Sequence, residues 1–136
     1  MKRDPLKKDG VLTGQQRTAV RAAIDASRER AEARLAALQR QFDDIVSASA
    51  EAVRDDEHDP EGATIAFERA QVAALRTQAR AQLAALDAAA AHLETADGGR
   101  CVRCGAAIGY ERLLARPAST RCVTCAAGGM TGVAGR

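Results

Sequence analysis

Apolar and small residues recur at alternating steps of three and four along residues 14–53. This spacing places them on one face of an α-helix, and it is typical of a coiled-coil seam. One doubled step of four interrupts the alternation around Ala31. We therefore predict a helix from about Gly14 to about Val53. Its seam positions are Val20, Ile24, Ser27, Ala31, Leu35, Leu38, Phe42, Ile45, Ser49 and Ala52.

The segment from residue 65 to residue 93 follows the same pattern. Its doubled step of four runs from Leu75 through Ala79 and ends at Leu83, at a broadly similar distance from the acidic residues 55–62 as the interruption in the first helix. Two helices that fold back on one another need matching interruptions, because both seams must drift together to stay in contact. The pattern predicts an antiparallel hairpin over residues 14–97, roughly 60 Å long. The second seam comprises Ile65, Glu68, Val72, Leu75, Ala79, Leu83, Leu86, Ala90 and Leu93.

Local signals mark the ends of these helices. Thr13 and Gln16 have capping-box spacing, which predicts the start of the first helix. Asp59 followed by Pro60 suits the N-cap and the first residue of the second helix. The glycines at 98–99 predict its end and lead into the cysteine-containing segment.

The composition favours long helices over a thick core. Apolar residues make up 46% of the 136 residues, yet aromatic residues make up 2%, so few side chains bury much area. Alanine, which has the highest helix propensity, is abundant. We predict a mainly α fold: a long antiparallel helical hairpin (coiled coil) with a small four-cysteine zinc-finger module at its base.

Neither a membrane span nor a secretory signal is predicted. No apolar run approaches the ~20 residues that cross a bilayer, and the N-terminus has no apolar signal segment. We therefore expect a cytoplasmic protein that does not contact membranes. Separately, we expect a monomer. The polar residues 1–13 are expected to form a flexible basic arm, and the glycine-rich residues 127–136 a disordered tail.

Four cysteines form two Cys-x-x-Cys pairs separated by seventeen residues. Four thiolates bind Zn²⁺ tetrahedrally at about 2.3 Å and leave no position for a substrate. We predict one structural zinc ion in a module over residues 98–126. A disulfide framework and a thioredoxin-like redox pair fit less well, because the chain shows neither a secretory signal nor a βαβ pattern. The predicted ligands are Cys101, Cys104, Cys122 and Cys125.

The charge is unevenly distributed, although the net charge is only +2. Residues 100–136 carry six arginines and one acid, Glu111, whereas residues 55–62 carry five acids. Neighbouring like charges repel, and two helices can be joined by a less charged segment. An acidic tip on a long hairpin can enter a narrow electropositive or metal-containing cavity. A solvated turn is the competing interpretation.

The residues around the cysteines form a longer pattern: Cys101-x-x-Cys104-Gly105, Ile108, Arg112-Leu113-x-Ala115-Arg116-Pro117 and Cys122-x-x-Cys125. Together with the preceding hairpin and its acidic tip, this pattern resembles the DksA/TraR zinc finger family over roughly residues 14–126. The resemblance implies a protein that binds bacterial RNA polymerase directly rather than DNA. It also implies that the hairpin enters the secondary channel, where acidic tip residues approach the catalytic magnesium and modulate transcription initiation.

The resemblance also implies roles for individual residues. The family's tip pattern is Asp-x-x-Asp-x-Ala; Asp56 and Asp59 match it, and Glu61 stands in place of the alanine. Asp56 and Asp59 are therefore the predicted polymerase contacts of the tip. The family's pocket for the alarmone ppGpp uses basic residues around the zinc module. Arg116 matches one of these and is a predicted nucleotide or partner contact, but Ala126 replaces a lysine, so the match to that pocket is partial.

Two other functions remain open. A nucleic-acid-binding zinc ribbon on a helical stalk predicts salt-sensitive binding, although the module offers one aromatic residue for stacking and no recognition helix. A zinc-thiolate redox sensor predicts release of the metal when the thiols are oxidised. No enzymatic activity is expected, because His58 and His92 complete no catalytic triad or Cys-His pair and no phosphate-binding glycine loop is present.

Overall fold

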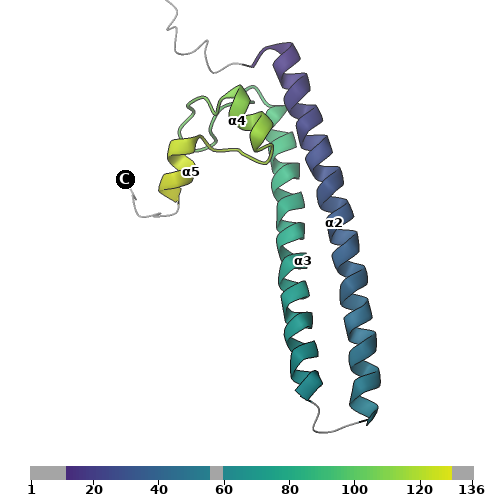
Figure 1. The fold of residues 1–136 in the computed structure, drawn as a ribbon. Coiled ribbons are helices and arrows are strands. Elements are labelled where there is room, and N and C mark those ends of the chain that lie inside the picture. The colour runs from purple at the N-terminus through teal and green to yellow at the C-terminus, as the bar shows by residue number, and fades with distance from the viewer. Residues whose placement is uncertain (1–11, 56–59, 130–136) are drawn as a thin grey trace, which may run out of the picture. The chain divides into compact units, whose positions relative to one another are not determined.

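The computed structural model describes residues 12–55 and 60–129. Their helices are α2 (Gly14–Asp55), α3 (Pro60–Leu93), α4 (Tyr110–Ala115) and α5 (Val123–Gly129), drawn in Figure 1. Within the described residues there is no strand, and one isolated antiparallel bridge joins Arg100 to Ala107. The predicted fold class is confirmed: two long helices with a small cysteine-containing module. No described helix combines the length and apolar character that crossing a membrane requires.

The start of α2 is fixed by its own sequence. The main-chain N–H of Thr13 donates to Gln16 Oε1 at 3.0 Å, and the N–H of Gln16 donates to Thr13 Oγ1 at 3.0 Å. This reciprocal pair confirms the predicted capping box. Leu12, which the sequence assigned to the flexible arm, is buried. The ordered chain therefore begins before the cap, because this apolar side chain is removed from solvent.

The chain divides into two compact units, and both long helices pass through both units. The terminal unit comprises Met1–Arg28 and Ala84–Arg136, and the middle unit comprises Glu29–Leu83. In each unit α2 and α3 run antiparallel (Figure 1). The acidic residues Asp56 and Asp59 lie outside the described residues.

The middle unit is held by the predicted seam. Leu38, Val72 and Ala79 are buried together. Glu68, the charged residue of the second seam, is exposed, so it carries no cost of a buried charge. The partly buried side chains packed against this cluster are Leu35, Phe42, Ile45 and Leu75.

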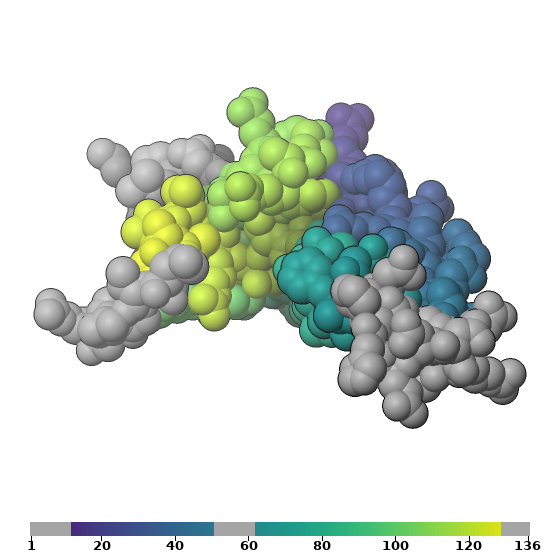
Figure 2. Space-filling model, turned by 60° about the horizontal axis from the view of Figure 1, so that its bottom comes forward, coloured from purple at the N-terminus to yellow at the C-terminus, as the bar shows by residue number. Residues whose placement is uncertain are grey.

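In the terminal unit the hairpin packs against the zinc module as well as against itself. Val20 of α2 and Leu86 of α3 are fully buried. Ala89 is buried, whereas the predicted seam residue Ala90 is half-buried. The reason is that residues of the zinc module cover a second face of α3, next to the seam. Val20 and Ile24 of α2 line one pocket together with Leu113 of α4, and Figure 2 shows the green segment around α4 beside α2.

Ion pairs across the terminal unit match the antiparallel register. Arg21 pairs with Glu94, and Arg28 Nη1 lies 2.7 Å from Asp87 Oδ1. Seven residues separate the two arginines and seven separate the two acids, as two antiparallel helices in one register require. These side chains are about half exposed, so each pair contributes at most about 1 kcal/mol and serves mainly to select the register.

Candidate metal centre

The first cysteine pair lies on a tight turn that follows the end of α3. The N–H of Gly105 donates to the carbonyl of Cys101 at 2.9 Å, which closes the turn. Gly105 has a φ of +76°, a conformation that favours glycine. The N–H of Arg103 points to Cys101 Sγ at 3.4 Å, and that of Ala106 points to Cys104 Sγ at 3.5 Å. Main-chain donors therefore face both sulfurs.

The second cysteine pair is built on the start of α5. The N–H of Cys125 points to Cys122 Sγ at 3.4 Å, and the N–H of Ala126 donates to the carbonyl of Cys122 at 2.9 Å. The helix continues to Gly129, three residues past the boundary at which the sequence predicted the disordered tail. Helix formation is initiated at the cysteine turn, so the glycines that follow need only extend it. Residues 130–136 lie outside the described residues.

The fold brings the four predicted ligands together. The N–H of Val102 donates to the carbonyl of Thr120 at 2.9 Å, which joins the two turns. The four Sγ atoms all lie within 4.8 Å of one another, and those of Cys104 and Cys122 are 3.7 Å apart. A zinc ion at about 2.3 Å from each sulfur of a tetrahedron requires sulfurs about 3.8 Å apart. The donor set and its size therefore fit one structural Zn²⁺ with four protein ligands.

The acidities of the metal-free thiols differ because they share hydrogen bonds. Burial opposes ionisation of Cys101, but the N–H groups of Cys104, Cys122 and Arg103 face it, and the pKa of its thiol falls to about 6. The pKa of Cys122 is lowered chiefly by the N–H of Cys125. Hydrogen bonding to Cys104, followed by burial, raises the pKa of Cys125 to about 12. Metal binding must therefore remove a proton that the cluster otherwise retains.

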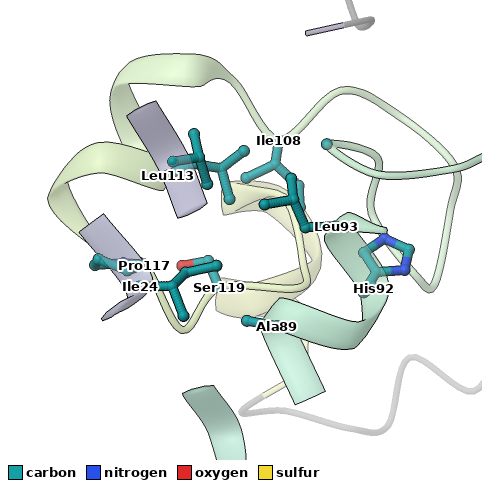
Figure 3. A pocket seen from close by; sticks show the side chains of 10 residues that line it. Ile24, Ala89, His92, Leu93, Ile108, Leu113, Pro117 and Ser119 are labelled. Atoms are coloured by element: carbon teal, nitrogen blue, oxygen red, sulfur yellow. The ribbon is translucent and has the colours of Figure 1, made fainter. Parts of the chain in front are cut away.

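Contacts on both sides of the first turn attach the metal centre to the hairpin base. His92 Nε2 lies 2.7 Å from the carbonyl of Arg100, the residue before the first ligand. Since a carbonyl accepts, Nε2 carries the proton. Figure 3 shows Leu93, Ile108 and Leu113 directed toward one another, with His92 at the edge of the group. The sequence assigned His92 no role because its partner is a main-chain atom, which leaves no signal in the sequence.

The zinc module has a small apolar core of its own. Ile108 and Leu113 are buried and Tyr110 is half-buried, but Leu114 is 39% exposed. Neighbouring residues of a helix lie about 100° apart around its axis. In the short helix α4, Leu114 is therefore turned toward solvent while Leu113 faces inward. Arg116, the predicted partner contact, is exposed directly after α4.

Comparison with known proteins shows what the metal centre is similar to. Residues 96–128 match the family model described as the prokaryotic dksA/traR C4-type zinc finger. This segment is therefore similar to a dksA/traR-type zinc finger. The match contains all four cysteines, and together with their geometry it supports one structural zinc ion. The resemblance drawn from the residues around the cysteines is confirmed for this segment.

The rest of the chain is compared through its fold. The structure of transcription factor DksA2 from Pseudomonas aeruginosa superimposes with a TM-score of 0.70 and 22% sequence identity. The alignment covers 87% of this chain and 85% of DksA2. The similarity in fold therefore extends over most of both chains. None of the curated proteins compared with the chain matches it significantly.

Proposed function

We propose that the protein is a transcription regulator of the DksA type that binds bacterial RNA polymerase in the cytoplasm. The observation that carries the proposal is a dksA/traR-type zinc finger joined to a hairpin whose fold is similar to that of a transcription factor. In the proposed mechanism the zinc finger fixes the base of the hairpin. The hairpin enters the secondary channel of the polymerase and modulates transcription initiation.

The acidic segment between α2 and α3 is the proposed effector of this mechanism. Asp56 and Asp59 match the family's tip pattern, and their carboxylates would approach the catalytic magnesium. A carboxylate changes the field around Mg²⁺ strongly because both groups are charged and oxygen is the preferred ligand of that ion. Glu61 adds a further charge where the family has alanine. Regulation that depends on this segment is therefore proposed separately from binding.

Binding and regulation can be tested separately. The zinc-loaded chain is expected to be retained by immobilised core RNA polymerase, and to change the yield of a promoter-initiated transcript. The double variant Asp56→Asn, Asp59→Asn is expected to bind equally well and to lose the effect on transcription. A zinc-loaded chain that is not retained would refute the proposed function. An unchanged transcriptional effect of the double variant would refute the role of the two carboxylates alone.

The exposed arginines of the zinc module favour a second candidate, direct binding of nucleic acid. Arg103, Arg116 and Arg121 are all exposed, and cations of this kind contact phosphates. This function predicts that the chain retards a duplex or a single strand in a gel at low salt, and that retardation falls steeply as salt rises. Absence of retardation at low salt rejects it. Arg116 also matches one basic residue of the family's ppGpp pocket, so calorimetry with ppGpp tests that separate contact.

A further inference from the structure

The outer face of α3 in the middle unit is an exposed surface without charge. Ala63, Phe67, Ala70 and Ala74 are all exposed and are spaced by four, three and four residues, which places them on one side of the helix. The side chains of Val72 and Ala79 are buried, so this side faces away from the seam. Thr77, Gln78 and Ala81 extend the same exposed surface without adding a charge.

Phe67 is unusual on this surface because it is a large aromatic residue that is mostly exposed to solvent. Its side chain is 69% exposed, whereas the other two aromatic residues of the chain, Phe42 and Tyr110, are partly buried. Phe42 lies under the guanidinium of Arg76, whose carbon is 4.2 Å from the ring centroid. A large aromatic group left in water forgoes a stabilisation that burial in an interface would recover.

The corresponding side of α2 in the same unit has the opposite character. Its exposed residues away from Leu38 include the charged side chains of Glu29, Arg40, Asp43 and Asp44. α3 does carry arginines, but Arg69, Arg76 and Arg80 are spaced by seven and four residues and so lie together along one flank. Of the three, Arg76 is turned to α2, where it donates to Gln39 Oε1 at 3.0 Å. The uncharged face is therefore confined to α3 and has a basic edge.

We propose that this α3 face, centred on Phe67, docks on an apolar, acid-edged wall of the RNA polymerase. The inference rests on the proposed function and deepens it. α3 begins at Pro60, within the acidic residues 55–62, so Phe67 lies about two turns from the start of the helix and enters a cavity that admits the tip to that depth. The alanines allow a close approach, Phe67 supplies the buried area, and the exposed Arg69 and Arg80 select acidic groups beside the apolar wall.

The test measures the affinity of the zinc-loaded full chain for core RNA polymerase. Phe67→Ala keeps a good helix former and is expected to weaken binding about tenfold or more, as loss of a buried aromatic contact does. Ala74→Glu is expected to weaken binding similarly, because it places a charge on the apolar face. Ala36→Glu is the matched control, an exposed alanine of α2 in the same unit, and is expected to bind within about twofold of the wild type. Circular dichroism verifies equal helix content in all variants.

The outcomes separate the inference from the proposed function. If the wild type binds and Phe67→Ala and Ala74→Glu bind equally well, the docking face is refuted while the proposed function stands. If the wild type does not bind, the proposed function fails and the inference fails with it. Sedimentation of the free chain gives a further outcome. A dimer that Phe67→Ala dissociates, with unchanged affinity for the polymerase, would assign the face to a second copy of this chain and overturn the inference.

Discussion

The guanidinium of Arg17, in the first turn of α2, donates a hydrogen bond to the main-chain carbonyl of Leu93, the last residue of α3. The last carbonyls of a helix have no intrahelical partner, and a cation is favourable at the negative end of the helix dipole. Arg21, one turn further along α2, pairs with Glu94. The beginning of the first long helix thus caps the end of the second, where the chain turns toward the zinc finger.

Replacement of Arg17 is expected to destabilise the terminal unit. In Arg17→Met the apolar stem of the side chain is retained but the carbonyl of Leu93 loses its charged donor, so the free energy of unfolding should fall by about 1–2 kcal/mol. Arg21→Met removes an exposed ion pair and should cost less than about 1 kcal/mol. Urea unfolding of the zinc-loaded chain, followed by circular dichroism, measures both. Equal losses in the two variants would show that the cap contributes nothing specific.

A methyl group at Gly98 is expected to displace the junction between α3 and the zinc finger. A Cβ atom at this position would contact the carbonyl oxygen of Leu93, a main-chain atom that cannot rotate away. Gly98→Ala should therefore lower the free energy of unfolding by about 1–3 kcal/mol, the range for overpacked sites. Gly14→Ala, where the added atom meets nothing within 4 Å, is the matched control and should be neutral or slightly stabilising. Thermal unfolding of both variants tests this, and a neutral Gly98→Ala would contradict it.

Zinc uptake is expected to release protons, fewer than four per ion at about pH 7. Cys101, with a pKa of about 6, is already ionised there, whereas Cys125, with a pKa of about 12, gives up its proton to the solvent when the metal binds. The number released should rise as the pH falls through about 6, and zinc affinity should fall over the same range. Calorimetry in buffers of different ionisation enthalpy counts the protons. Release of four protons at about pH 7 would contradict the low pKa of Cys101.

The metal-free module should respond to pH in two opposite ways. The pKa of Cys101 is lower in the folded state than in a free thiol, so its contribution to stability is present above a pH of about 9 and is lost as the pH falls through about 6. The pKa of Cys125 is raised, so its contribution is present below about 9 and is lost as the pH rises through about 12. After zinc is removed with a chelator, the free energy of unfolding, measured against pH, should therefore pass through a maximum between about pH 6 and about pH 12. With zinc bound, this profile should disappear.

Features that depend on neighbouring residues could be predicted from the sequence. The capping box needs Thr13 and Gln16 three residues apart, and a chain with that spacing forms it locally. The seam of the middle unit follows from apolar periodicity, because a helix fixes which residues share a face. The two cysteine turns could likewise be predicted, from the Cys-x-x-Cys spacing. In each case the interacting residues lie within one helical turn or follow one repeat.

Other features were missed because the partner comes from a distant part of the chain. Burial of Ala89 rather than Ala90 depends on coverage of α3 by the zinc finger, which periodicity along α3 alone does not contain. His92 finds a main-chain carbonyl of Arg100, and Arg17 finds that of Leu93. Every residue carries a main-chain carbonyl, so no sequence motif indicates which carbonyl accepts the hydrogen bond.

The sequence by itself determined the two helices, their antiparallel pairing and the four zinc ligands, because helical periodicity and the Cys-x-x-Cys spacing are local properties of the chain. Tertiary structure decided which helix face the zinc finger covers, which arginine caps Leu93, and that Phe67 remains in solvent on an uncharged face. These outcomes depend on side-chain directions and on contacts between segments more than seventy residues apart, as between Arg17 and Leu93. Only the folded chain brings such groups within reach of one another.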